Sequence, residues 1–376
     1  MMLNTTFPRI DAQSTMLGFG CMRLPTTPDG KIDQPEAIKM IRHAIDNGLK
    51  YIDTAYPYHG GESEIVVGKA LQDGYRDKVL LATKLPVWNV KKPEDMMALL
   101  DEQLQKLQTD HIDFYLLHAM NNERLEQMQQ MDYKAFFAEA LAQGKIRYPS
   151  FSFHDDYDAF IKILNDYDWA MCQVQMNFLD DKSQATLEGI REAGRRGVGV
   201  VVMEPLRGGL LANPPQDIVD FYVRQSVQRS PVEWAFRYLY SMPEVITILS
   251  GMSNWEQLED NLRIFDLPER PALSEEEQQL YVNVKEAYYA CTKTRCTACR
   301  YCQPCPMGVA IPHIFQGYDT TLMRRDGNFS GGYARIVEDK ADASLCVKCR
   351  KCESACPQHL PIVQYLEEIH AQCANA

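Results

Sequence analysis

Eight short apolar runs, each followed by an amphipathic stretch, recur between Met16 and about Leu267. Most of these runs are rich in β-branched or aromatic residues, which is typical of buried strands, and the stretches between them have helical periodicity. We expect strands at residues 17–22, 51–55, 79–84, 112–117, 148–153, 172–176, 198–203 and 245–249. Eight strands that alternate with eight helices predict a closed parallel (β/α)8 barrel, or TIM barrel.

The stretch from Pro35 to Asn47 illustrates the helical pattern. One face of this stretch carries Ile38, Ile41, Ala44 and Ile45. Gly48 follows directly and is a typical residue for the end of a helix. An open doubly wound sheet is the alternative architecture, but the Gly-rich dinucleotide fingerprint expected after its first strand is missing.

The chain continues well beyond the predicted barrel, because 376 residues exceed the roughly 250 that such a barrel needs. After Leu267 come Pro268, Pro271 and Ser274-Glu-Glu-Glu277, a capping-box pattern that predicts a helix through about Tyr289. We therefore expect a barrel in residues 1–270 and a second, smaller domain in residues 271–376.

Charge and hydropathy exclude several classes of partner. A formal net charge of -12 disfavours nucleic acid and anionic membranes, which bind clustered Lys and Arg. No run of 18 apolar residues occurs, and the first nine residues do not resemble a signal peptide. We expect a cytoplasmic protein that binds neither membrane nor nucleic acid.

Eight of the twelve cysteines form two tight clusters. The first reads Cys296-Thr-Ala-Cys299-Arg-Tyr-Cys302-Gln-Pro-Cys305-Pro, and the second reads Cys346-Val-Lys-Cys349-Arg-Lys-Cys352-Glu-Ser-Ala-Cys356-Pro. The second matches C-x2-C-x2-C-x3-C-P, whereas the first has two residues before its Cys-Pro. Both motifs resemble those of bacterial-type ferredoxins, which bind [4Fe-4S] clusters.

That resemblance implies two [4Fe-4S] clusters that share ligands between the motifs. One cluster would be held by Cys296, Cys299, Cys302 and Cys356, and the other by Cys346, Cys349, Cys352 and Cys305. The spacer of roughly forty residues is more similar to the α-helical ferredoxins, so we expect an all-helical domain. A pair of zinc sites is the alternative, and disulfides are disfavoured in an unexported chain.

Four polar residues lie at or just beyond the ends of predicted strands: Asp53, Tyr58, Lys84 and His118. Residues of these types in loops more often cap or pack than catalyse. In a barrel, however, the carboxyl ends of all strands meet at one mouth, where active sites lie. The four side chains are therefore expected close together.

The surrounding motifs resemble the aldo-keto reductase family over about residues 15–265. They are Tyr51-Ile-Asp-Thr-Ala-Tyr-Pro-Tyr58 with Gly60-Gly-Glu62, Thr83-Lys84 and Leu116-Leu-His118. The resemblance implies that Tyr58 donates a proton to a carbonyl, that Lys84 paired with Asp53 lowers the pKa of Tyr58, and that neutral His118 orients the carbonyl.

The resemblance also implies a nicotinamide cofactor, NADPH or NADH, across the mouth. Its expected contacts are Gly20, Met22, Asp53, Ser152, Gln173, Met203, Gly251, Ser253, Gln257 and Asn261. Three positions depart from the family. Phe153 replaces a common Asn, Met203 replaces an aromatic ring, and Gly251 or Ser253 stands where a Lys or Arg commonly meets the 2′-phosphate.

The sequence therefore predicts an NAD(P)H-dependent carbonyl or alcohol oxidoreductase with electron-transferring clusters. A small carbonyl or alcohol is the expected substrate, Trp88 is expected near it, and a ferredoxin or flavodoxin is a candidate electron carrier. The alternatives are an iron-sulfur redox sensor and an electron-transfer subunit with a weakly catalytic barrel.

Overall fold

The computed structural model describes residues 2–296, 300–325 and 329–373. The chain forms two compact units, one of residues 1–208 and 233–273 and the other of residues 209–232 and 274–376. Each unit is described by itself. Within the described ranges, every helix is too short or too polar to cross a membrane.

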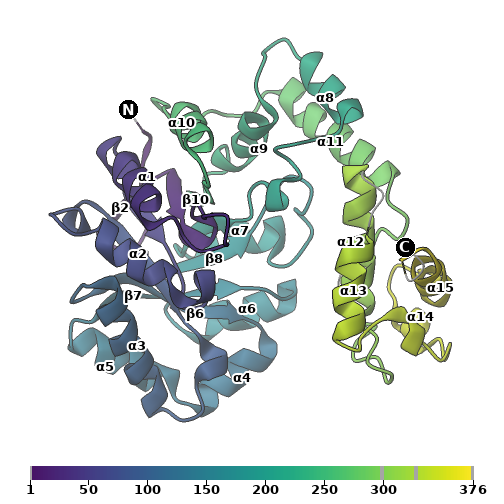
Figure 1. Ribbon diagram of the computed structural model, residues 1–376, viewed down its shortest axis with the longest axis horizontal. Helices are drawn as coiled ribbons and strands as arrows, with labels where there is room; N and C mark the ends of the chain where they lie inside the picture. Colours follow the sequence, from purple (N-terminus) through teal and green to yellow (C-terminus); the bar gives the residue numbers. More distant parts are fainter. Residues whose placement is uncertain (1, 297–299, 326–328, 374–376) are drawn as a thin grey trace. The chain divides into compact units, whose positions relative to one another are not determined.

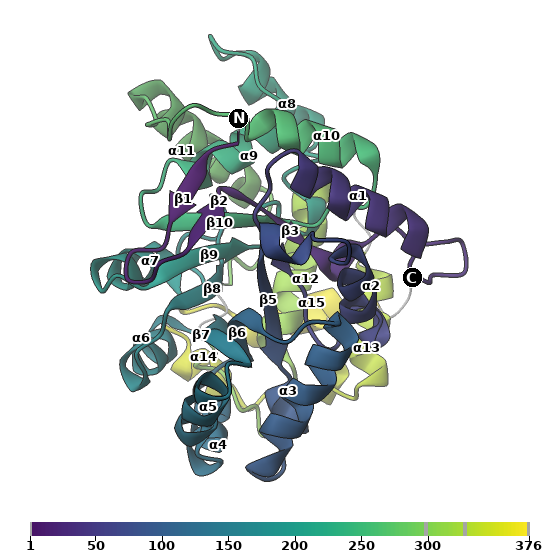
Figure 2. The same ribbon diagram turned by 90° about the vertical axis from the view of Figure 1, so that its left-hand side faces the viewer.

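Eight parallel strands close into a barrel in the order β10-β3-β4-β5-β6-β7-β8-β9 (Figures 1 and 2). Their bounds are β3 Leu17–Gly20, β4 Tyr51–Asp53, β5 Leu80–Leu85, β6 Ile112–Met120, β7 Ile146–Phe153, β8 Met171–Gln175, β9 Gly199–Met203 and β10 Val245–Ser250. Each strand overlaps one of the eight predicted runs. The predicted (β/α)8 barrel is confirmed.

Helices surround the strands, as Figure 1 shows for α1 to α7. They are α1 Gln34–Asp46, α2 Ser63–Ala70, α3 Glu94–Leu107, α4 Asn122–Gln130, α5 Tyr133–Ala142, α6 Tyr157–Asp166, α7 Thr186–Arg195, α9 Pro231–Tyr240 and α10 Trp255–Ile264. Helix α1 begins where the Asp33 side chain accepts a hydrogen bond from the Glu36 amide. It ends at Asp46, and Gly48, two residues later, has a φ of 93° that favours glycine.

A hairpin at the N-terminus, which the sequence analysis did not predict, precedes the barrel. Strand β1 (Asn4–Thr6) pairs antiparallel with β2 (Gln13–Thr15). Phe7, in the connecting turn, packs on Phe114 with 4.7 Å between ring centroids. A Cβ on Gly199 would lie 2.3 Å from the Phe7 ring, so the strand needs glycine there. The hairpin therefore packs against the core at the amino end of the barrel.

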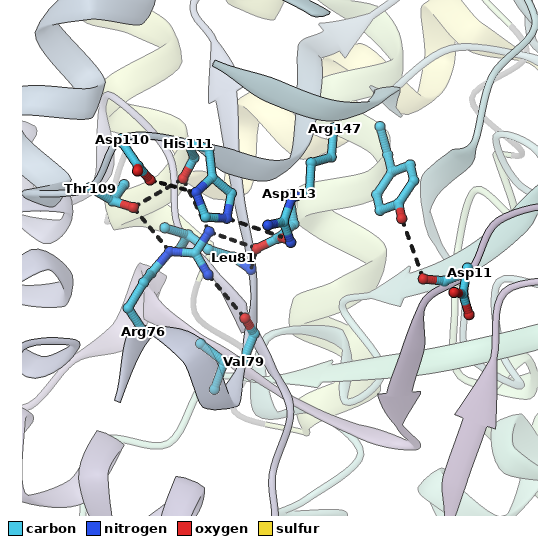
Figure 3. A network of polar contacts seen from close by, with 10 residues as sticks. Asp11, Arg76, Val79, Leu81, Thr109, Asp110, His111, Asp113 and Arg147 are labelled. Atoms are coloured by element: carbon cyan, nitrogen blue, oxygen red, sulfur yellow. Dashed lines mark hydrogen bonds and ion pairs between the residues drawn. The ribbon is translucent and has the colours of Figure 1, made fainter. Parts of the chain in front are cut away.

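A network of charged groups also lies at the amino ends of the strands (Figure 3). The buried Asp113 carboxylate accepts hydrogen bonds of 2.8 Å from Arg76 and from Arg147. It accepts a third, of 2.9 Å, from the Leu81 amide. Because Leu81, Asp113 and Arg147 lie at the beginnings of β5, β6 and β7, the network fastens three neighbouring strands together, and Arg76 joins it from the short helix η3 (Arg76–Lys78).

All the regular secondary structure of the second unit is helical within its described residues. Its helices are α8 Gln216–Val223, α11 Glu275–Ala290, α12 Ile311–Arg324, α13 Ser330–Glu338, α14 Lys351–Ala355 and α15 Ile362–Cys373. Helix α11 begins with the predicted capping box, in which Ser274 and Glu277 each bond the other's backbone. The predicted helical architecture is confirmed.

Helix α8 belongs to this second unit, although the sequence-based division assigned residues 209–232 to the barrel. It packs against α11. Arg325 Nη2 lies 2.6 Å from Asp217 Oδ2, and Arg229 Nη1 lies 3.0 Å from Glu277 Oε1. Contacts with residues far along the chain thus hold the segment in this unit.

Candidate active site and cluster site

Every strand of the barrel carries a predicted site residue within two residues of its carboxyl end. In barrel order from β3 to β10 these are Gly20, Asp53, Lys84, His118, Ser152, Gln173, Met203 and Gly251. Since the strands are parallel, all these positions border the same mouth.

Lys84 joins the candidate catalytic residues to one another. Its ammonium donates hydrogen bonds of 2.8 Å to Asp53 Oδ1 and to the Thr54 carbonyl. It also lies 3.4 Å from Tyr58 Oη and 5.0 Å from the centroid of the Tyr58 ring. Lys84 and Asp53 are almost fully buried, so their ion pair is shielded from water.

This arrangement governs the protonation of all three groups. Burial raises the pKa of Tyr58, and the nearby ammonium of Lys84 opposes that rise. Burial by itself would lower the pKa of Lys84, but Asp53 and Tyr58 outweigh it and raise that pKa. Burial raises the pKa of Asp53 against the opposing charge of Lys84. Lys84 therefore remains cationic beside the phenol.

His118, on β6, faces Tyr58, which lies in the short helix η2 (Tyr58–Gly61) after β4. The two ring centroids are 6.2 Å apart, and the rings are nearly perpendicular at 79°. Burial, followed by the positive charge of Lys84, lowers the pKa of His118 well below its usual value. Nδ1 of His118 is buried without a hydrogen-bond partner among the described residues. His118 is therefore a neutral imidazole with one unused polar atom.

Trp88, in the short helix η4 (Val87–Asn89), lies beside His118 with 5.0 Å between ring centroids. The guanidinium of Arg124 lies over the Trp88 ring, 5.4 Å from its centroid. The indole thus forms an aromatic wall next to the His118 imidazole.

Ser152 and Gln173, two of the predicted nicotinamide contacts, differ in their hydrogen bonds within the protein. Ser152 Oγ accepts a 2.7 Å hydrogen bond from the Ala119 amide and so fixes the turn after His118. Gln173 is buried, and its Oε1 has no partner among the described residues. A buried acceptor without a donor is costly unless a ligand satisfies it. Gln173 therefore fits the NH2 group of a nicotinamide carboxamide.

The predicted cofactor contacts that follow β10 are Gly251, Ser253, Gln257 and Asn261. Most of their hydrogen bonds lie within this segment of the chain. The Ser253 amide donates to Gln257 Oε1 at 2.8 Å, and Asn261 Nδ2 donates to Ser250 Oγ at 2.8 Å. On the neighbouring strand β3 and just after it, a Cβ on Gly20 would lie 3.4 Å from the Ser250 carbonyl oxygen, and Met22 is 58% exposed. These contacts shape the rim between β10 and β3.

Two buried polar residues behind Lys84 escaped the sequence analysis. Gln103 Nε2 donates to the Lys84 carbonyl at 3.1 Å and to Glu64 Oε1 at 2.6 Å. Both side chains are fully buried. The signal in the sequence was a polar residue, Gln103, on the apolar face of α3.

The cysteine motifs line two cavities in the second unit. A cavity of about 200 Å³ is bordered by Cys302 and by four thiols of one predicted ligand set: Cys305, Cys346, Cys349 and Cys352. A smaller cavity is bordered by three thiols of the other set: Cys296, Cys302 and Cys356. Cys299, the fourth member of that set, lies outside the described residues.

The donor chemistry and the surroundings of these cavities fit iron-sulfur clusters. Cysteine thiolates are the usual ligands of such clusters, and the cysteines that border the two cavities belong to both motifs. Asp319 anchors the approach to Cys296, since it accepts hydrogen bonds from the amides of residues 293–295. As they lie, no three metal-ligating side chains of the described residues converge on one metal ion.

Comparison with known proteins agrees with both parts of this description. Residues 16–277 match the model of the aldo/keto reductase family, and residues 295–361 match a 4Fe-4S dicluster domain. The chain is 26% identical over 313 residues to the uncharacterized oxidoreductase YqkF of Bacillus subtilis, covering 74% of this chain and 95% of YqkF.

Solved structures share the barrel. The holo form of aldo-keto reductase AKR11C1 from Bacillus halodurans superposes with a TM-score of 0.64 at 26% identity, over 76% of this chain and 96% of that one. An aldo-keto reductase from Klebsiella pneumoniae in complex with NADPH has a TM-score of 0.59 at 23% identity, over 76% and 95% of the two chains. This likeness shows a shared fold. With a family match over most of its length, the chain belongs to the aldo/keto reductase family and carries a C-terminal 4Fe-4S domain.

Proposed function

We propose that this oxidoreductase interconverts carbonyls and alcohols with NADPH or NADH, and that Tyr58, Lys84, Asp53 and His118 are its catalytic residues. The contact of the buried Asp53–Lys84 ion pair with Tyr58 Oη carries the proposal. A phenol beside a buried ammonium is suited to give a proton to a carbonyl oxygen and to take it back.

In this proposal each side chain has one task. Tyr58 Oη transfers the proton, and Lys84 stabilises the phenolate that forms. Asp53 holds Lys84 in place and offsets its charge. Neutral His118 donates a hydrogen bond to the substrate oxygen, with Trp88 forming the adjacent wall. A bound nicotinamide would supply the hydride, with its carboxamide held by Gln173 and the other predicted contacts.

The decisive experiment is Tyr58→Phe in the cluster-loaded, full-length protein. Carbonyl reduction should fall by about 10²–10⁴-fold, because the variant loses the proton donor but keeps the ring. Cofactor affinity, measured by fluorescence titration, should remain close to that of the parent. Tyr56→Phe is the matched control, since Tyr56 Oη contacts Glu102 and not Lys84. Near-normal turnover by Tyr58→Phe would assign the acid to another group.

We further propose two [4Fe-4S] clusters with ligands shared between the motifs. The two cavities support this assignment, because each one gathers thiols from both motifs. Anaerobic reconstitution should give about eight irons and eight sulfides per chain. Cys356→Ser should lose about half of the iron, whereas Cys373→Ser, which changes a cysteine outside both motifs, should lose none. Four irons in the parent protein, or stoichiometric zinc, would contradict the shared-ligand arrangement.

The clusters are proposed to exchange electrons with an external carrier such as a ferredoxin or flavodoxin. A hydride carries two electrons, whereas a cluster of this type ordinarily accepts one, so direct transfer would need a carrier that divides the pair. Mixing the anaerobic protein with NADH or NADPH should therefore leave the visible absorbance of the clusters unchanged on the time scale of one turnover. Rapid bleaching would instead reveal an internal route.

A sensor or electron-transfer subunit with a weakly catalytic barrel is the second candidate function. The departures from the family pattern at Phe153, Met203 and Gly251 favour it, because they stand at positions where family members commonly contact the cofactor. Anaerobic assays with a panel of carbonyls separate the two. Turnover abolished by Tyr58→Phe supports the enzyme, and nucleotide-independent cluster reduction without carbonyl turnover supports the sensor.

A further inference from the structure

The rim segment that follows β10 has no positive charge to offer a phosphate. Residues 251–257 read Gly-Met-Ser-Asn-Trp-Glu-Gln and include Glu256. A 2′-phosphate normally meets a Lys or Arg side chain, since charge-assisted hydrogen bonds are the strong ones. Within this segment alone, the chain therefore looks unsuited to NADPH.

A cation reaches this place from a different element. Arg23 closes the short helix η1 (Cys21–Arg23), directly after β3. Its stem lies against Gly251, because a Cβ built on Gly251 would be 3.2–3.4 Å from the Cβ, Cγ and Cδ atoms of Arg23. Gly251 is not among the glycines with positive φ. What glycine provides here is room for the arginine.

The backbone around Arg23 is fastened on both sides. Ser253 Oγ donates a 2.9 Å hydrogen bond to the Arg23 carbonyl, which joins η1 to the segment after β10. The amide of the next residue, Leu24, donates to His59 Nε2 at 3.1 Å. The position of the Arg23 backbone is therefore fixed, and the side chain extends along the rim.

The guanidinium itself has no hydrogen bond or ion pair with any residue that the structure describes. Arg23 is exposed. Desolvation and Asp180 raise the pKa of Glu204, and the charges of Arg207 and, to a smaller extent, Arg23 oppose the rise. Asp180 is already satisfied by Gln175, Asn177 and Arg207 at 2.8–3.2 Å. The five donors of Arg23 thus remain available to a ligand.

We propose that Arg23 binds the 2′-phosphate of NADPH and so replaces, from the neighbouring strand β3, the cation missing at Gly251 or Ser253. This inference rests on the proposed nicotinamide function. It makes NADPH the preferred cofactor, with a specificity residue on β3–η1 and not after β10. Gly251 and Ser253 contribute by positioning Arg23.

The test measures binding by fluorescence titration of the anaerobic, cluster-loaded protein with NADPH and, separately, with NADH. Arg23→Ala should weaken NADPH binding by about 10–100-fold, the usual weight of a charge-assisted hydrogen bond, and NADH binding by less than about twofold. Arg23→Lys should lie between Arg23→Ala and the parent. Lys39→Ala, which removes a charge that is 70% exposed on α1, is the matched control and should change neither affinity.

Two outcomes would overturn the proposal. Equal weakening of both nucleotides would place Arg23 at the pyrophosphate, which NADH also has, and no weakening would remove it from the cofactor site. Failure of the proposed function has a different signature, because the parent protein would then bind neither nucleotide.

Discussion

Two buried aspartates at opposite ends of the same barrel are paired with cations in different ways. Asp113, at the amino end, accepts hydrogen bonds from Arg76, Arg147 and the Leu81 amide (Figure 3). Asp53, at the carboxyl end, has a single ion pair, with Lys84. At the same mouth, His118 Nδ1 and Gln173 Oε1 are buried without hydrogen-bond partners among the described residues.

The difference separates a structural site from a reactive one. A carboxylate surrounded by donors has nothing left to bind, so the Asp113 network holds strands together. Around Asp53 the chain leaves polar groups unsatisfied, which lowers stability and leaves donors and acceptors for a cofactor and a substrate. Changes at the mouth should therefore affect turnover more than stability, and changes at the amino end should do the reverse.

Lys84→Met gives the largest expected effect. Turnover should fall by about 10²–10⁴-fold, because Tyr58 loses the charge that favours its phenolate. The stability loss should be smaller than that of Asp113→Ala, since Asp53 can take up a proton. Burial raises the pKa of Asp53, so this compensation is present at low pH and disappears as the pH rises through that pKa. Urea unfolding should show a more stable variant at pH 5 than at pH 8.

A matched lysine serves as the control for this variant. Lys106 lies 4.0 Å from the ring centroid of Tyr56 and pairs with Glu102, so it repeats the lysine-over-tyrosine contact away from the mouth. Lys106→Met should keep full turnover. A Lys84→Met protein that remains active but unfolds easily would reverse the comparison.

Asp113→Ala should lower the free energy of unfolding by about 3 kcal/mol, because a buried ion pair loses one partner and the Leu81 amide loses its acceptor. The kcat of the molecules that remain folded should not change. Urea denaturation followed by circular dichroism, together with turnover at low temperature, measures both quantities. A loss of activity without a loss of stability would show that the amino end communicates with the mouth.

The two arginines of the network should contribute unequally. The Arg76 side chain is 15% exposed, whereas that of Arg147 is 54% exposed. Arg76→Ala should cost about 2 kcal/mol, and Arg147→Ala less than about 1 kcal/mol, since water screens the exposed pair. If urea titrations gave the same loss of unfolding free energy for both variants, the stabilisation would come from joining the strands and not from the burial of each ion pair.

The smallest expected effect is a pH dependence at His118. Its pKa is lowered by burial and by Lys84, so the folded protein binds fewer protons there than the unfolded chain. Stability should fall as the pH drops below about 6.5, the pKa of an unfolded histidine. His118→Gln should remove this slope from urea midpoints between pH 5 and 7, and His43→Gln, at a half-exposed histidine, should retain it. An unchanged slope in His118→Gln would mean that His118 is protonated in the folded state.

Local patterns in the sequence were sufficient for the barrel and for the place of the site. Strands β3–β10 could be predicted because their apolar runs are continuous, and Asp53, Lys84 and His118 stand out because each is a polar residue at a strand end. The hydrogen bond of Ser152 with Ala119 could not be predicted, because it joins two strands whose register the sequence does not state. The β1–β2 hairpin was missed because strands of three residues are too short for a periodic signal.

Helix α8 has a consequence for how the protein is made. Its apolar residues Ile218 and Tyr222 are buried in a unit whose other helices begin at Glu275. At about 5–20 residues per second, the roughly fifty intervening residues take several seconds to synthesise. During that interval the ribosome has released α8 but not α11, while the last strand of the barrel is still emerging. At that stage the apolar side chains of α8 have no helix to cover them, and they lie between two segments of a barrel that is not yet closed. We expect chaperones to bind the nascent chain at this segment.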